Sequence, residues 1–116
     1  MISPDVRFLL EDIVSYGHEA VETVGGLNAD VILAERFREH AVLRTVQIVG
    51  EASAQILKKM PQGIEGLALQ DAAGFRNVLV HGYAKLRMER VVSIVHDALP
   101  VLIAGAERVL QEGKTE

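Results

Sequence analysis

The hydrophobic positions near the start of the chain recur at steps of three and four residues, the spacing of one face of an α-helix. These positions are Val6, Leu9, Leu10, Ile13, Gly17, Ala20, Val21 and Val24. Ser3-Pro4-Asp5 precedes them with a candidate N-cap, a proline at the first helical position and an acid in the first turn, an arrangement typical of helix starts. The sequence therefore predicts a first helix that begins at Pro4 and is stopped by Gly25-Gly26.

The same spacing continues in a second segment, for which Asn28 or Asp30 can serve as the N-cap. Its inward positions are Ala34, Phe37, Ala41, Thr45, Ile48, Ala52 and Ile56. Lys58 and Lys59 suit the negative end of a helix, and Pro61 with Gly63 breaks the chain soon afterwards. We expect one long helix that ends near Lys59.

Two further helices are predicted, one over about residues 64–80 and one from about Arg87 onward. Their inward positions are Ile64, Leu67, Phe75 and Val78 in the third, and Val91, Val95, Ala98, Leu102 and Val109 in the fourth. Pro100 interrupts the fourth pattern, and an interior proline costs about 3 kcal/mol, so we expect a kink or a split there. The expected fold is all-α, an antiparallel up-and-down four-helix bundle that forms one domain over residues 1–116, with a frayed tail at 112–116.

The composition narrows the class of protein. Cysteine is absent, the formal net charge is −4, and the start of the chain does not resemble a signal peptide. We therefore expect a cytoplasmic protein without a membrane span or a metal or other cofactor, in which any contact with nucleic acid is local. A mean hydropathy of +0.21 in so short a chain favours an apolar interface between two copies, a homodimer.

The candidate chemistry gathers in the segment Arg76-Asn77-Val78-Leu79-Val80-His81-Gly82-Tyr83. Histidine can move protons near neutral pH, and arginine can hold a phosphate bidentately. Cleavage of RNA by its own 2′-hydroxyl requires both of these abilities and no metal ion. On an ideal helix Asn77 and His81 share one stripe, whereas Arg76 and Tyr83 share another about 100° away.

One straight helix cannot point all four polar groups inward. Either Gly82 ends the helix and the chain turns to bring Tyr83 back, or the groups meet a second copy of the same helix across a two-fold axis. We favour the second arrangement, a composite site to which both protomers contribute Arg76 and His81.

The same octapeptide matches the Arg-x4-His-x-Tyr motif of the HEPN superfamily and resembles the HepT toxins, which pair with a minimal nucleotidyltransferase antitoxin. The stretches 43–52 and 99–102 resemble the second and last helices of that family. The connection between Met60 and Gly74 departs from the family pattern, because many relatives have a Pro-Trp pair there and this chain has no tryptophan.

The resemblance implies a dimeric, metal-independent ribonuclease toxin that cleaves RNA, with tRNA and mRNA as candidate substrates. Arg76 and His81 would be catalytic, and Asn77 would orient the substrate. Glu51 stands at a family polar position and would orient the histidine or the arginine. Tyr83 would accept AMP from the antitoxin, and the added anionic group would block RNA.

Other interpretations of these residues stay open. His81 can be an ordinary histidine at a helix C-terminus, Arg76 can form an ion pair with Asp71 or Glu51, and Tyr83 can be an interface aromatic. The arginines elsewhere, and His18, His40 and His96, read as solvated surface or core-edge residues. A non-catalytic module that binds nucleotide or presents substrate to a nucleotidyltransferase is the alternative function, and a purely structural dimer is the third.

Overall fold

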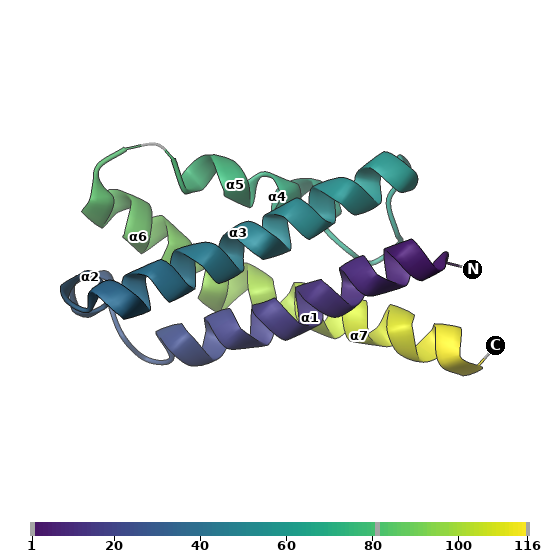
Figure 1. Ribbon diagram of the computed structural model, residues 1–116, viewed down its shortest axis with the longest axis horizontal. Coiled ribbons are helices and arrows are strands. Elements are labelled where there is room, and N and C mark those ends of the chain that lie inside the picture. The colour runs from purple at the N-terminus through teal and green to yellow at the C-terminus, as the bar shows by residue number, and fades with distance from the viewer. Residues whose placement is uncertain (1, 81, 116) are drawn as a thin grey trace.

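The structure is a computed structural model that describes residues 2–80 and 82–115, and all regular secondary structure in these ranges is helical. The elements are α1 (Pro4–Val24), α2 (Ala29–Ala34), α3 (Arg36–Lys59), α4 (Leu69–Ala73), α5 (Phe75–Val78), α6 (Ala84–Ser93), the π-helical turn η1 (Ile94–Ala98) and α7 (Leu99–Thr115). Figure 1 shows the chain reversing direction from α1 to α3, again to α4 and α5, and again to α6 and α7. The predicted all-α bundle is confirmed.

The first helix has the predicted ends. The Ser3 hydroxyl accepts a hydrogen bond from the Val6 amide at 3.2 Å, and Pro4 is the first helical residue. Gly25 ends α1 with φ 50°, a conformation that glycine adopts without steric cost. The buried face of α1 holds Val6, Leu10, Ile13, Gly17, Ala20 and Val24, all of which were expected inside.

The prediction of a single long second helix is wrong, because the chain leaves helical geometry at Glu35, with φ −112° and ψ 99°. Asn28 does cap a helix, and its Oδ1 accepts from the Val31 amide at 3.0 Å, but this helix is the short α2. The Arg38 guanidinium donates to the Thr23 carbonyl at 2.7 Å and so ties α3 to the end of α1. Phe37, expected inside, is 92% exposed, although Thr45 and Ile56 on the same predicted face of α3 are buried.

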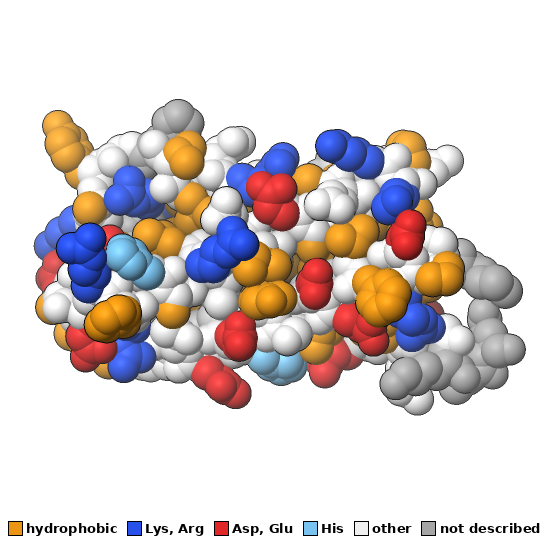
Figure 2. Space-filling view, in the orientation of Figure 1, with side chains coloured by type: hydrophobic (Ala, Val, Ile, Leu, Met, Phe, Trp, Pro, Cys, Tyr) orange, Lys and Arg blue, Asp and Glu red, His pale blue; other side chains and the backbone are white. Residues whose placement is uncertain are grey.

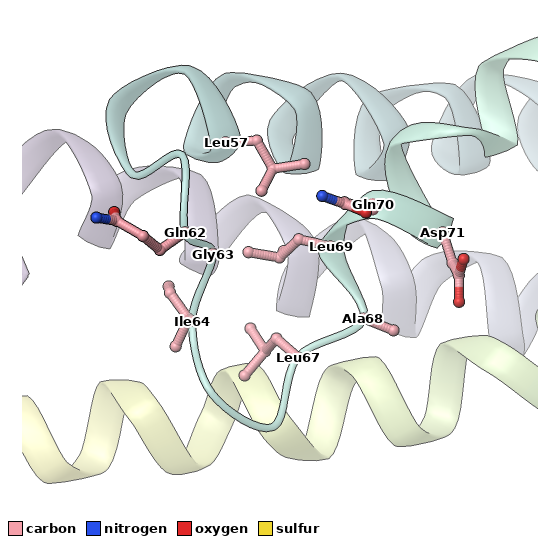
Figure 3. Close-up of a pocket in the computed structure, with 9 residues that line it drawn as sticks. All are labelled: Leu57, Gln62, Gly63, Ile64, Leu67, Ala68, Leu69, Gln70 and Asp71. Atoms are coloured by element: carbon pink, nitrogen blue, oxygen red, sulfur yellow. The ribbon is translucent and has the colours of Figure 1, made fainter.

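The predicted bounds of the third helix, about residues 64–80, are also wrong at both ends, because α4 begins at Leu69 and α5 ends at Val78. Gly63 and Gly66 adopt φ values of 77° and 86°, which no α-helix contains, so residues 61–68 form turns and α4 begins at Leu69. Figure 3 shows the side chains of Leu57, Ile64, Leu67 and Leu69 around a hollow of about 290 Å³ beneath this connection. The expected inner residues Leu67 and Phe75 are nevertheless buried.

The fourth helix begins at Ala84 and is split at the place that Pro100 predicted. In η1 the Leu99 amide donates to the Ile94 carbonyl five residues back, which shifts the hydrogen-bond register before α7 begins. Pro100 is then the second residue of α7, where an amide proton is not needed.

The core is almost entirely aliphatic and lies between α1, α3 and the segment from α6 to α7. The molecule measures 46 × 23 × 20 Å. None of the described helices combines the length and the apolarity that a membrane span requires. Helix α3 packs on α1 with one face and on α4 and α5 with another, so it connects the core to the motif.

Candidate active site

The motif is divided among a helix, a turn and the start of the next helix. Helix α5 contains Arg76 and Asn77 and ends at Val78, residues 79–80 form a turn, and Gly82 adopts φ 85°. Tyr83 is extended and directly precedes α6. The stripe predicted to join Asn77 to His81 required a helix through Val80, so that part of the geometric interpretation is wrong.

Arg76 is held at two points of its side chain. Its Nε donates to the Ala73 carbonyl at 3.1 Å, and its Nη1 lies 3.8 Å from Glu51 Oε2 on α3. The side chain is 44% exposed. The guanidinium is therefore oriented by the backbone and still faces solvent, where it can meet an anion.

The approach of α5 to α3 depends on Gly50, which the sequence analysis did not single out. Gly50 is buried in the middle of α3, and a Cβ built there would lie 3.0 Å from Arg76 Cγ and 3.2 Å from the Ala72 carbonyl oxygen. Those distances are shorter than ordinary van der Waals contact. The stem of Arg76 thus occupies the space that a side chain at position 50 would fill.

Between α3 and α5 lies an open groove of about 580 Å³, which contains Arg76. Its lining residues are His40, Leu43, Arg44, Gln47 and Glu51 from α3, and Arg76, Asn77, Leu79 and Val80 from α5 and the following turn. Two guanidinium groups, an imidazole, two amides and one carboxylate thus share one groove with three aliphatic side chains. This combination suits a ligand that carries both phosphates and flat apolar groups.

The structure brings together three of the predicted site residues, Arg76, Asn77 and Glu51. The alternative that Arg76 forms an ion pair holds for Glu51, whereas Asp71 lines other hollows. The pair is loose and half exposed, and such pairs contribute little to stability. Glu51 is therefore positioned to influence the arginine without immobilising it.

The other two predicted residues are His81 and Tyr83. His81 lies outside the described residues. Tyr83 is 82% exposed and is not among the described residues that line the groove.

Three further groove residues were not predicted as site residues: His40 and Arg44, which were expected to be solvated surface, and Gln47. The Arg44 guanidinium donates to Gln47 Oε1 at 3.3 Å, so the two side chains face the groove together. Figure 2 shows Lys and Arg side chains and a histidine gathered over the half of the molecule where α3 begins, whereas acidic side chains gather along α1. The heptad spacing of positions 40, 44, 47 and 51 was the available signal.

Within residues 2–80 and 82–115, no three side chains of His, Asp or Glu gather in a group that could hold a metal ion.

Comparison with known proteins gives consistent matches over most of the chain. Residues 13–109 match the family model described as "Ribonuclease HepT-like". The chain is 25% identical to "Putative RNase MJ1380" of Methanocaldococcus jannaschii, with 86% of this chain and 92% of that protein covered. It is 26% identical to "Putative RNase MJ0127" of the same organism, with 100% and 98% covered.

A bacterial relative is also similar over nearly its full length. "Putative RNase TTE0752" of Caldanaerobacter subterraneus subsp. tengcongensis is 23% identical, with 93% of this chain and 96% of that protein covered. No solved structure matches the chain.

Proposed function

Because the chain belongs to the family of HepT-like ribonucleases, we propose that it is a metal-independent RNA endonuclease and the toxin of a toxin–antitoxin pair in the cytoplasm. The observation that carries the proposal is Arg76, whose Nε is fixed by the Ala73 carbonyl while the guanidinium lines a solvent-open groove. A planar cation held in this way suits the bidentate binding of a phosphodiester.

The reaction we propose is an internal transfer within the RNA strand. His81 takes the proton of a 2′-hydroxyl, the 2′-oxygen forms a bond to the adjacent phosphorus, and the bond from phosphorus to the 5′-oxygen breaks as that oxygen gains a proton. The products are a 2′,3′-cyclic phosphate and a 5′-hydroxyl. Arg76 stabilises the negative charge that builds on the non-bridging oxygens.

Asn77 and Glu51 support this reaction from the two walls of the groove. The Asn77 amide can donate to a phosphate or sugar oxygen and so orient the strand. Glu51, 3.8 Å from Arg76 Nη1, keeps the guanidinium turned toward α3 until a phosphate replaces the carboxylate as its partner.

Regulation by the antitoxin would act on Tyr83. We propose that a nucleotidyltransferase antitoxin transfers AMP from ATP to the Tyr83 hydroxyl, with release of pyrophosphate. The ring is 82% exposed at the start of α6, after the Gly82 turn, which makes the hydroxyl accessible to an enzyme. The added phosphate would oppose RNA binding by charge and by volume.

The test of the activity uses purified protein with total RNA and with tRNA in the presence of EDTA. The wild-type protein is compared with His81→Ala and Arg76→Ala, each shown by circular dichroism to be folded. We expect each variant to lose activity by about 10²-fold or more, and we expect the wild-type products to end in a cyclic phosphate. Equal cleavage by all three proteins would contradict the proposal.

The test of regulation adds a minimal nucleotidyltransferase and ATP to the wild-type protein and to Tyr83→Phe. Mass spectrometry should find one added AMP on the wild-type protein, together with loss of cleavage, and neither effect on Tyr83→Phe. If no AMP is transferred but the nucleotidyltransferase binds the untreated protein and abolishes cleavage, inhibition is by binding and the role of Tyr83 is refuted.

A further inference from the structure

Five side chains follow one line along α3, at positions separated by three and four residues. They are Phe37, His40, Arg44, Gln47 and Glu51. The last four line the groove, and Phe37 is 92% exposed one turn before His40. At 1.5 Å per residue this α3 stripe is about 21 Å long, which is longer than a single phosphodiester needs.

We infer that the α3 stripe binds the single-stranded RNA that extends from the cleaved phosphate, so that the enzyme recognises several nucleotides of unpaired RNA. The inference rests on the proposed ribonuclease function, because it takes Arg76 as the position of the reacting phosphate. The stripe reaches that position through Glu51, the partner of Arg76 across the groove.

The side chains of the stripe match the chemistry of an unpaired strand. Arg44, oriented by its hydrogen bond to Gln47, supplies a cation for a second phosphate and a flat surface for a base. His40 and Phe37 supply rings on which bases stack. The same groove has apolar surface from Leu43, Leu79 and Val80. Unpaired bases can pack on this surface, whereas the bases of a duplex are stacked inside it and cannot.

The charge distribution supports a local rather than a general attraction to RNA. The chain as a whole carries a formal net charge of −4, whereas two of the three formally charged side chains that line the groove are arginines. A polyanion would therefore meet a more favourable charge in this groove than over the molecule as a whole.

The test compares a dinucleotide with single-stranded oligonucleotides of increasing length that contain the same cleavable step. Arg44→Ala, His40→Ala and Phe37→Ala should each lower kcat/KM for the long RNA by about tenfold. They should lower cleavage of the dinucleotide much less than cleavage of the long RNA, since the dinucleotide occupies mainly the reacting position. Arg108→Ala is the matched control, because Arg108 is a half-exposed arginine of α7 that does not line the groove.

A binding measurement separates this inference from the proposed activity. Fluorescence anisotropy with 2′-O-methyl RNA, in which the attacking hydroxyl is blocked, should show tight binding by the wild-type protein and by Arg108→Ala, and weaker binding by Arg44→Ala. The slope of log affinity against log salt should fall in magnitude by about 0.7 for Arg44→Ala, the value for one phosphate contact in single-stranded nucleic acid. If no RNA is cleaved but Arg44→Ala still binds RNA more weakly and with the smaller salt slope, the proposed activity is refuted and RNA binding by the α3 stripe is supported.

Three outcomes would overturn the inference. Equal losses on the dinucleotide and the long RNA would place these residues in the reaction or in folding rather than in strand binding. Unchanged binding and cleavage in all three variants would leave the stripe without a role toward RNA. A change of oligomeric state, seen by sedimentation with RNA binding intact, would identify the stripe as a protein interface.

Discussion

Arg76 depends for its position on a neighbour that has no side chain. The space beside Gly50 holds the Arg76 stem, and the same gap lets the backbone at Ala72 approach α3. Alanine at position 50 would favour the helix by about 0.5–1 kcal/mol in isolation, yet its Cβ would push α4 and α5 away from α3. The cost of this overlap is therefore larger than the gain in helix propensity.

We predict that Gly50→Ala lowers the free energy of unfolding by about 1 kcal/mol through this overlap. Because Arg76 moves with α5, RNA cleavage should fall by an order of magnitude or more even at temperatures where the variant is fully folded. Urea unfolding and single-turnover cleavage measure the two effects. Gly26→Ala is the control, since a Cβ there meets nothing within 4 Å and both quantities should stay unchanged.

The sequence predicted which polar side chains lie together better than it predicted how the helices bring them together. Arg76, Asn77 and Glu51 were identified and do lie together, because the motif and the polar position on the second helix are visible as residue types. Gly50 and Arg44 were missed, since their roles depend on which face of α3 meets α5. The spacing of positions 40, 44, 47 and 51 marks one face of the helix, but no local pattern tells which neighbouring helix that face meets.

Among the helices, the ends marked by special residues were predictable and the unmarked break was not. Ser3, Pro4 and Gly25 define α1, and Pro100 correctly indicated the split in the last helix. The break at Glu35 has neither glycine nor proline. It accompanies a tertiary contact, the hydrogen bond from Arg38 to the Thr23 carbonyl fifteen residues earlier.

The π-helical turn η1 leads to a prediction for Pro100. Because α7 starts a new register at Leu99, the proline lies in a first turn and lacks no hydrogen bond that the helix needs. Pro100→Ala should therefore change the free energy of unfolding by less than about 1 kcal/mol, well below the 3 kcal/mol typical of an interior proline. A stabilisation near 3 kcal/mol in urea unfolding would show that Pro100 strains the helix.

For the molecule as a whole, the proposed composite site requires a dimer, and the surface offers a region for it. Leu86, which lies on α6 shortly after the motif, is a large hydrophobic residue that is 58% exposed. Its exposure in one chain is consistent with a partner that covers this part of α6 and brings a second motif near the first.

We predict that Leu86→Glu, with a charge in this region, makes the protein monomeric by sedimentation and abolishes cleavage while circular dichroism stays unchanged. Phe8→Glu, at an exposed hydrophobic residue of α1, should remain dimeric and active. A mixture of Arg76→Ala and His81→Ala proteins should regain part of the activity, since about half of the dimers are mixed and hold one intact Arg76 and one intact His81 in the shared site. A monomer with full activity would refute the composite site.

The shortness of α4 and α5 has a consequence for how long the active arrangement lasts. Helices of five and four residues cannot persist alone, so this segment is held by docking on α3 and can detach while α1, α3 and α7 stay folded. Amide hydrogens in residues 69–78 should then exchange with solvent through local opening, sooner than those of the core helices. The lifetime of the site would be that of one docked segment, and any ligand that spans the groove would lengthen it by holding that segment closed.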